Sequence, residues 1–163
     1  MLGFTAFNLT CPCRGDRLFA SLGERKIRMT ASSTVSISIK RRPEEVYEYL
    51  VDPANFPKWS IFIKEIKQEG NEWIATTPER TVRIRFTSRN EFRVLDHYVT
   101  VSPHLQVYVP MRVLADPEND SAVIFTVFRS PGMTDQQYND DIGMVLTDLA
   151  GLKRVLGDKD GLH

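Results

Sequence analysis

The sequence predicts an α+β domain in which a seven-stranded antiparallel sheet packs against one long helix near the C-terminus. Apolar and polar residues alternate in seven short segments separated by turn residues, which is typical of antiparallel strands joined by hairpins. Residues 135–156 instead carry apolar side chains at alternating steps of four and three, the spacing of one helix face. Two prolines, Pro53 and Pro57, separate two further short helices that follow the first strand.

The strands can be paired in register because side chains alternate between the two faces of a sheet. A tight turn at Arg89-Asn90 would place Val82 opposite His97, and a turn at Pro78-Glu79 would place Trp73 opposite Ile84. The expected strands are 35–40, 61–68, 72–77, 80–88, 91–101, 105–114 and 121–129. A three-residue link at 102–104 sets Val99 opposite Val107 and completes one common apolar face: Trp73, Ala75, Val82, Ile84, Phe86, Leu95, His97, Val99, Leu105, Val107, Val109, Met111 and Val113.

The opposite face of this sheet is polar. Arg83 is expected opposite Asp96 as a surface pair, in a face that otherwise reads as solvated. Pro110 has no N–H to give to a ladder, so a bulge or a gap in pairing is expected there. For the last strand two alternatives remain open, with inward side chains that are either Val123, Phe125 and Val127 or Ile124, Thr126 and Phe128.

The helices have recognisable ends. The first is expected at 43–51, starting with Pro43, and the prolines after it turn the chain so that Phe56 and Trp59 point back at apolar surface. The long helix is expected at 135–156, with Thr134 and Gln137 as a capping box and Gly157 at its C-terminal cap.

Composition limits the classes of protein. The chain has 163 residues with 21 basic and 21 acidic side chains, so no basic excess suggests nucleic-acid binding. No apolar run approaches the roughly 18 residues of a membrane span. Cys11 and Cys13 are the two cysteines, which excludes a disulfide framework for the domain and favours a cytoplasmic, reducing compartment.

The N-terminal region differs from the rest. Residues 1–28 carry five basic and two acidic residues without a sustained period, and Met29 opens the segment that leads into the first strand. No basic residues precede the short apolar run near the start, which argues against a signal peptide. We expect 1–32 to be a dispensable or disordered extension, 33–157 to form the ligand-binding domain and 158–163 to be a tail.

Three stretches carry a resemblance to a known superfamily: VSISIKRRPEEVYEYLVDPANFPKWS, the strand succession that follows it, and PGMTDQQYNDDIGMVLTDLAGLKRVL. Together, over roughly 33–156, they resemble the START-related helix-grip (SRPBCC) superfamily, in its polyketide cyclase/dehydrase-like branch. The resemblance implies that the sheet curls around the long helix and leaves a cavity, with Phe56 and Trp59 sealing one end. The superfamily has no universal catalytic motif, so the resemblance indicates a fold and not a particular reaction.

His97 is the residue of most chemical interest, because the predicted register places an imidazole on the apolar face. It is either a buried neutral imidazole or a polar anchor or general acid/base for a ligand. Arg93, on the same face, is expected nearer the cavity mouth, where it would hold a carboxylate or reach solvent. The expected ligand-binding residues are Trp73, Phe86, Arg93, His97, Val109, Met111, Phe125 and Val145.

The leading functional hypothesis is the binding of a small hydrophobic or aromatic molecule by a protein without catalysis. The alternative is a polyketide cyclase/dehydratase-like enzyme that uses His97 as general acid/base, and a third class is an interaction protein whose cavity is filled. We expect no metal and no cofactor, since the three histidines are scattered and no phosphate-binding loop or HExxH motif is present. The expected partner is an apolar or aromatic ligand, without nucleic acid, and the protein is expected to be a monomer or homodimer.

Overall fold

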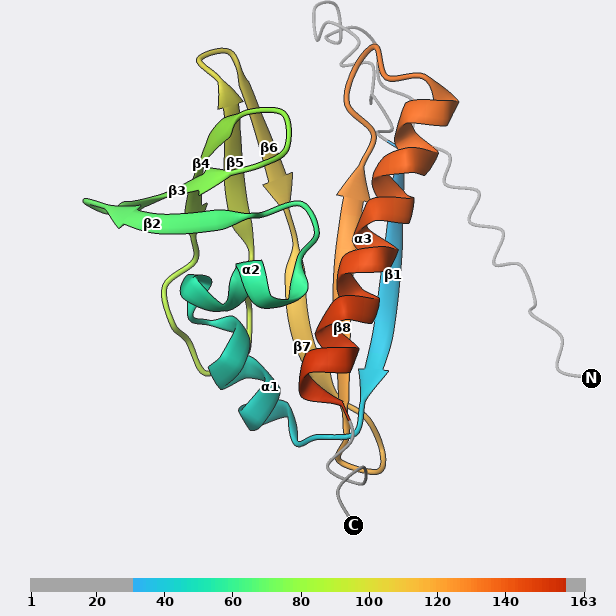
Figure 1. The fold of residues 1–163 in the computed structure, drawn as a ribbon. Coiled ribbons are helices and arrows are strands. Elements are labelled where there is room, and N and C mark those ends of the chain that lie inside the picture. The colour runs from blue at the N-terminus through green and yellow to red at the C-terminus, as the bar shows by residue number, and fades with distance from the viewer. Residues whose placement is uncertain (1–30, 158–163) are drawn as a thin grey trace, which may run out of the picture.

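The computed structural model describes residues 31–157, which form eight strands, three short helical segments near one end and a long C-terminal helix (Figure 1). The elements in chain order are β1 (Ser32–Ile39), α1 (Pro43–Leu50), the 3-10 turn η1 (Pro53–Asn55), α2 (Phe56–Trp59), β2 (Glu65–Glu69), β3 (Glu72–Thr76), β4 (Thr81–Phe86), β5 (His97–Ser102), β6 (Leu105–Val109), β7 (Met111–Ala115), β8 (Ser121–Phe128) and α3 (Asp135–Leu156). The predicted α+β class and the order of its elements are confirmed.

The strands form two antiparallel sheets rather than one. β1, β8 and β7 lie side by side in that order, and β2, β3, β4, β5 and β6 form the second sheet. Between them stands Pro110, which separates β6 from β7 and has no N–H to donate. Its carbonyl oxygen still accepts a bond of 3.0 Å from the amide of Thr126. The predicted interruption at Pro110 is therefore present, and it divides the strand expected at 105–114, which gives eight strands rather than seven.

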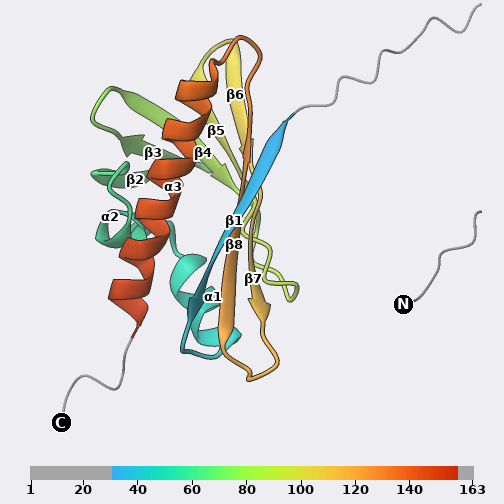
Figure 2. The ribbon, with the colours of Figure 1, turned by 90° about the vertical axis from the view of Figure 1, so that its right-hand side faces the viewer.

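The long helix α3 packs mainly against β1, with further contacts to β8 and α2, and runs alongside β1 and β8 in Figures 1 and 2. Its start is fixed by the predicted capping box, in which the side chains of Thr134 and Gln137 bond each other's backbone amides. Leu149 and Leu152 are almost completely buried. Each contributes about 1.5–3 kcal/mol relative to an exposed side chain, which holds the helix on the sheet.

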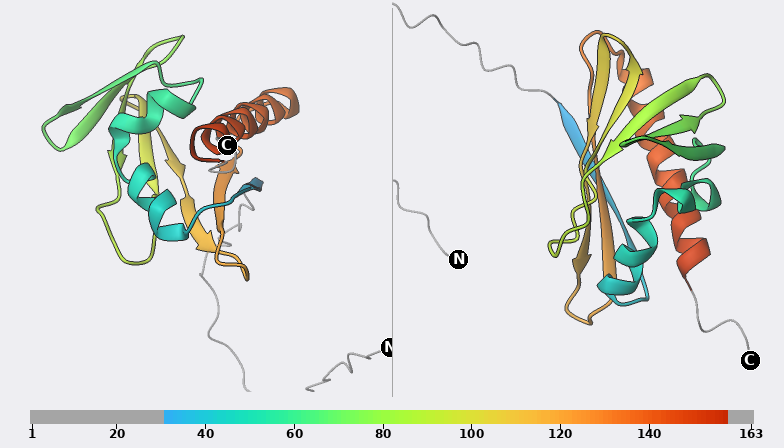
Figure 3. Two further views of the ribbon diagram at one scale, coloured as in Figure 1. Left: turned by 60° about the horizontal axis from the view of Figure 1, so that its bottom comes forward. Right: turned by 90° about the vertical axis from the view of Figure 1, so that its left-hand side faces the viewer.

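The corner formed by α1, η1 and α2 closes one end of the molecule, beneath the β2–β3 hairpin in the right panel of Figure 3. The carboxylate of Asp52 accepts the amide of Ala54 and so starts the turn at Pro53. Phe56 and Trp59 are both buried against the core, as the sequence predicted. At Gly151, on α3, a Cβ atom would lie under 3.0 Å from the carbonyl oxygen of Trp59, so α2 and α3 meet at a distance that requires glycine.

Two of the three predicted registers are confirmed, with Trp73 opposite Ile84 and Val99 opposite Val107. The third is wrong by four residues, because His97 lies opposite Phe86 rather than Val82. The expected two-residue turn at Arg89-Asn90 is instead a long connection from Thr87 to Asp96. The side chain of Asn90 organises it by bonding the amides of Phe92 and Val94 and the carbonyl oxygens of Ser88 and Val94. Because four is an even number, the paired side chains of β4 and β5 keep their predicted faces.

The predicted pair of Arg83 with Asp96 is wrong for the same reason. Arg83 lies opposite Thr100 and forms ion pairs with Glu69 and Glu72. Asp96 is only 8% exposed, rather than solvated.

The carboxylate of Asp96 links three groups across the break between the sheets. It accepts the amide of Met111 at 3.0 Å, the guanidinium of Arg112 at 2.9 Å and the hydroxyl of Tyr108. These bonds satisfy a carboxylate that would otherwise be costly to bury.

The alternative left open for β8 is resolved by its burial. Val123 is completely buried and Phe125 packs against the core, so the set that includes Val123, Phe125 and Val127 faces inward. β1 follows the predicted alternation, with Val35, Ile37 and Ile39 on the inner side. The expectations for Cys11, Cys13 and the rest of residues 1–28 lie outside the described residues.

Candidate functional site

His97 begins β5 and lies on the inner face of the five-stranded sheet, with 4% of its surface exposed. Its Nδ1 lies 3.0 Å from the carbonyl oxygen of Leu95. A carbonyl can only accept, so Nδ1 carries the proton and the neutral ring presents the lone pair of Nε2 as an acceptor. Burial lowers the pKa of His97 from 6.5 to about 4, so the imidazole is neutral at pH 7.

Aromatic rings from three parts of the chain surround this imidazole. The ring centroid of Phe86, on β4, lies 5.1 Å from that of His97, and Phe125, on β8, lies 6.3 Å away. Phe56, from α2, meets the imidazole edge-on at 6.1 Å. Sequence reasoning treated Phe56 only as part of the end seal, yet it also contacts the imidazole because the proline corner turns it inward.

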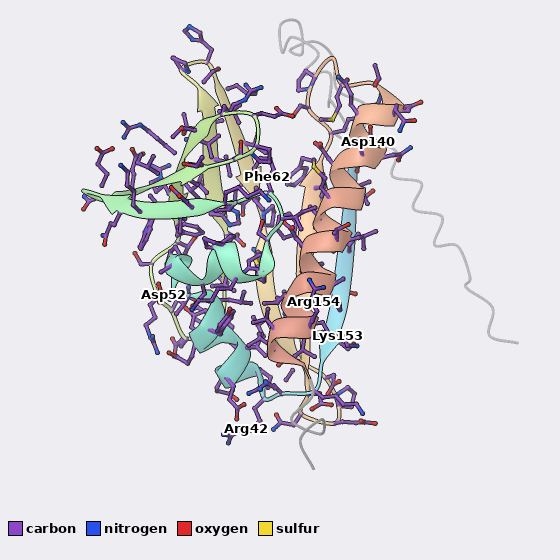
Figure 4. The ribbon with its side chains drawn as sticks, in the orientation of Figure 1. Arg42, Asp52, Phe62, Asp140, Lys153 and Arg154 are labelled. Atoms are coloured by element: carbon purple, nitrogen blue, oxygen red, sulfur yellow. The ribbon has the colours of Figure 1, made fainter. Side chains whose placement is uncertain are left out.

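Further along the inner face, apolar side chains are covered only in part. Phe62, in the connection from α2 to β2, is half-buried and is labelled in Figure 4 on the side toward α3. Five inward-facing residues remain half-buried, and we call them the inner apolar patch: Trp73, Val99, Val107, Phe125 and Val145. Part of the apolar surface of these side chains therefore remains exposed to solvent.

Seven of the eight expected ligand-binding residues fall into three groups. Phe86, Phe125 and His97 come together, and Trp73 and Val145 belong to the inner apolar patch. Val109 and Met111 face the same side, but they are 9% and 1% exposed, so they form the floor of the core.

Arg93 does not join the others. It lies in the connection between β4 and β5, where it adopts a positive φ of 54°, and it forms an ion pair with Glu44 of α1. The four-residue register error explains the difference, because it removes Arg93 from the strand.

Asp148 is a site residue that sequence reasoning missed. Its carboxylate accepts the hydroxyl of Ser60 at 2.7 Å and the amide of Ile61 at 2.6 Å, and so ties α3 to the connection between α2 and β2. Burial raises the pKa of Asp148, while these hydrogen bonds oppose the rise. An aspartate beside the apolar stripe of the predicted helix was the available signal.

Two hollows occur on the outer faces of the sheets. One of about 540 Å³ is lined mainly by outward residues of β2–β5, among them Lys67, Ile74 and Arg83. The other, of about 300 Å³, adjoins Tyr108 and Phe128. Neither lies beside His97.

Within residues 31–157, no three His, Cys, Asp or Glu side chains are grouped so that they could hold a metal ion. Over the same residues, no helix combines the length and the apolar character that crossing a membrane requires.

The sheets, the long helix and the two short helices that close one end define a helix-grip protein of the START-related superfamily, as the resemblance implied. Residues 30–152 match the model of the family described as polyketide cyclase / dehydrase and lipid transport. The chain belongs to this family. No curated protein matches it at the level of sequence.

Solved structures agree with this fold. The protein XoxI from Bacillus cereus is 20% identical, with a TM-score of 0.66 over 77% of this chain and 95% of that one. An uncharacterised protein from Bacillus thuringiensis is 21% identical, with the same TM-score over 77% and 98% of the two chains. Ara h 8.0201 is 14% identical, with a TM-score of 0.60 over 78% and 97%.

Proposed function

We propose that the protein binds a small hydrophobic or aromatic molecule between the five-stranded sheet and α3. The observation that carries this proposal is the inner apolar patch, whose side chains face inward and yet stay half-buried. A ligand that covered them would remove this apolar surface from water, at about 25 cal/mol per Å². The family, described by polyketide and lipid chemistry, supports the same class of ligand.

His97 supplies the polar group of this proposed site. A neutral imidazole with Nδ1 held by Leu95 can accept a hydrogen bond at Nε2, and it adds no charge to an apolar environment. Such a group orients a ligand that carries a hydroxyl or an N–H.

Binding can be tested with a neutral fluorescent probe, N-phenyl-1-naphthylamine, and with native mass spectrometry of freshly purified protein. We expect a co-purified molecule or a rise in probe fluorescence. Val145→Gln places an amide in the inner apolar patch and should weaken probe binding at least about fivefold, since burying an unpaired amide costs about 1–3 kcal/mol. Leu146→Gln changes a neighbour that is 47% exposed and is the matched control.

Thermal denaturation checks that both variants fold. The proposal is wrong if the wild-type protein neither carries a molecule nor binds the probe. It is also wrong if Val145→Gln and Leu146→Gln, both folded, reduce binding equally.

A second function is favoured by the unshared lone pair of Nε2, namely a cyclase or dehydratase in which His97 acts as general base. The low pKa of His97 makes it a weak base, but it keeps the ring unprotonated at pH 7. His97→Gln should then abolish turnover of a polyketide substrate in a variant that thermal denaturation shows to be folded. Unchanged turnover would exclude this role.

A further inference from the structure

The first sixteen residues of α3, from Asp135 to Ala150, contain four aspartates and no basic residue. Three of the aspartates have partners: Asp135 pairs with Arg129, Asp140 accepts the side-chain amide of Gln136, and Asp148 binds the connection between α2 and β2. Asp141 has no partner among residues 31–157.

The direction of Asp141 follows from helix geometry. Asp141 precedes Asp148 by seven residues, which is two turns less about 20°, so both side chains leave the helix on the same flank. Asp148 binds Ser60 and Ile61, so this flank of α3 faces the connection between α2 and β2. Asp141 lies on it about 10 Å nearer the start of α3, four residues before Val145 of the inner apolar patch.

The environment of Asp141 is partly desolvated. Its side chain is half-buried, and burial raises the pKa of its carboxyl, with the neighbouring charge of Asp140 adding to the effect. A carboxylate that has lost water without gaining a partner is stabilised by any cation that arrives beside it.

The inner apolar patch itself offers no positive charge to an anion. The residues of the inner apolar patch are uncharged, and Arg93, the cation that the sequence placed at its mouth, is paired with Glu44. A ligand carboxylate beside Asp141 would be repelled by its charge, because Lys64, the cation on this flank, acts on Asp148 and not on Asp141.

We propose that the ligand of this protein is an apolar or aromatic molecule that carries a protonated amine, with the amine paired to Asp141 and the apolar part on the inner apolar patch. This inference rests on the proposed function and narrows its ligand class. The pair of ammonium and carboxylate orients the ligand along α3, with its apolar end toward His97.

Three probes that share one ring system test the inference: 1-naphthylmethylamine, 1-naphthalenemethanol and 1-naphthoate, titrated at pH 7 and low salt. We expect the amine to bind about tenfold more tightly than the alcohol, and the alcohol more tightly than the carboxylate, because hydrogen bonds to charged groups exceed neutral ones. The preference for the amine should shrink as salt is raised.

Asp141→Asn should lower the affinity for the amine to that for the alcohol and leave the alcohol unchanged. Asp140, which Figure 4 labels at the upper part of α3, accepts a hydrogen bond from Gln136. Asp140→Asn removes this adjacent charge and should change both affinities less than twofold. Thermal denaturation of both variants checks that they fold.

The outcomes separate the two proposals. Equal binding of amine and alcohol to the wild type, or equal effects of the two variants, overturns the amine inference and leaves the proposed function standing. If none of the three probes binds, N-phenyl-1-naphthylamine does not bind either and no molecule co-purifies, both proposals are overturned.

Discussion

The contact between α2 and α3 makes a sharp prediction about two glycines of the same helix. A Cβ atom at Gly151 would lie under 3.0 Å from the carbonyl oxygen of Trp59, which is backbone and cannot rotate away. At Gly143, about two turns earlier, nothing lies within 4 Å of an added Cβ atom. One substitution, glycine to alanine, therefore meets a closed contact at one position and open space at the other.

The two substitutions should change the free energy of unfolding in opposite directions. Alanine is favoured over glycine inside a helix, so Gly143→Ala should raise the free energy of unfolding by about 0.5–1 kcal/mol. Gly151→Ala gains the same preference but forces α2 and α3 apart, and overpacking of this kind typically costs about 1–3 kcal/mol. We expect a net loss at Gly151 of roughly 0.5–2 kcal/mol once the helix preference is subtracted.

Urea unfolding followed by far-UV circular dichroism measures both variants on one scale. Because Trp59 leads into the segment that Asp148 holds, Gly151→Ala should also increase hydrogen exchange of the Ile61 amide. If Gly151→Ala is as stable as Gly143→Ala, α2 and α3 are not in the close contact described here, and the reasoning fails.

Three further predictions concern buried polar groups. The pKa of His97 is lower in the folded than in the unfolded chain, so the free energy of unfolding should be highest above pH 6.5 and fall by about 3 kcal/mol as the pH drops to 4. Urea unfolding at several pH values should show a smaller pH dependence in His97→Phe. Ser60→Ala removes a hydroxyl that donates to Asp148 and accepts the amide of Ile63, and should cost about 1–2 kcal/mol in urea unfolding. Asp96→Ala leaves Arg112 and a buried backbone amide without their acceptor and should cost about 2–3 kcal/mol in the same assay.

The two predictions about hydrogen bonds each have a control that tests the cause. Ser38→Ala removes an exposed hydroxyl of β1, and Glu72→Ala removes an exposed partner of Arg83, so both should change stability by less than about 0.5 kcal/mol. Losses as large as those at Ser60 and Asp96 would show that the buried bonds are not the reason. An unchanged pH slope in His97→Phe would contradict the burial of a neutral imidazole.

Much of the fold followed from the sequence because its signals were local. The alternation in β1, the capping box of Thr134 and the proline corner each need only neighbouring residues, and each is present in the structure. The faces of β3 to β6 were also correct, since the turn before Arg80 and the link at 102–104 fix parity over short distances.

The errors came from interactions that neighbouring residues do not reveal. Nothing local shows that Asn90 uses both ends of its amide to hold a ten-residue connection, with the hydroxyl of Tyr47 from α1 accepting its backbone N–H. Once that connection is long, Arg93 leaves the strand and Asp96 reaches Arg112 instead of Arg83. His97 kept its face only because the shift was an even number of residues.

The division at Pro110 also determines where the chain can change length. Val109 and Met111, on either side of the proline, are both buried, so the alternation of the five-stranded sheet continues through the kink into β7 without a change of phase. One residue inserted beside Pro110 would turn Met111 and Val113 outward and break the match with β8, whereas the connection from Thr87 to Asp96 can take up an extra residue between its anchoring bonds. Relatives with loops of other sizes should therefore vary at the second place and keep a fixed count at the first.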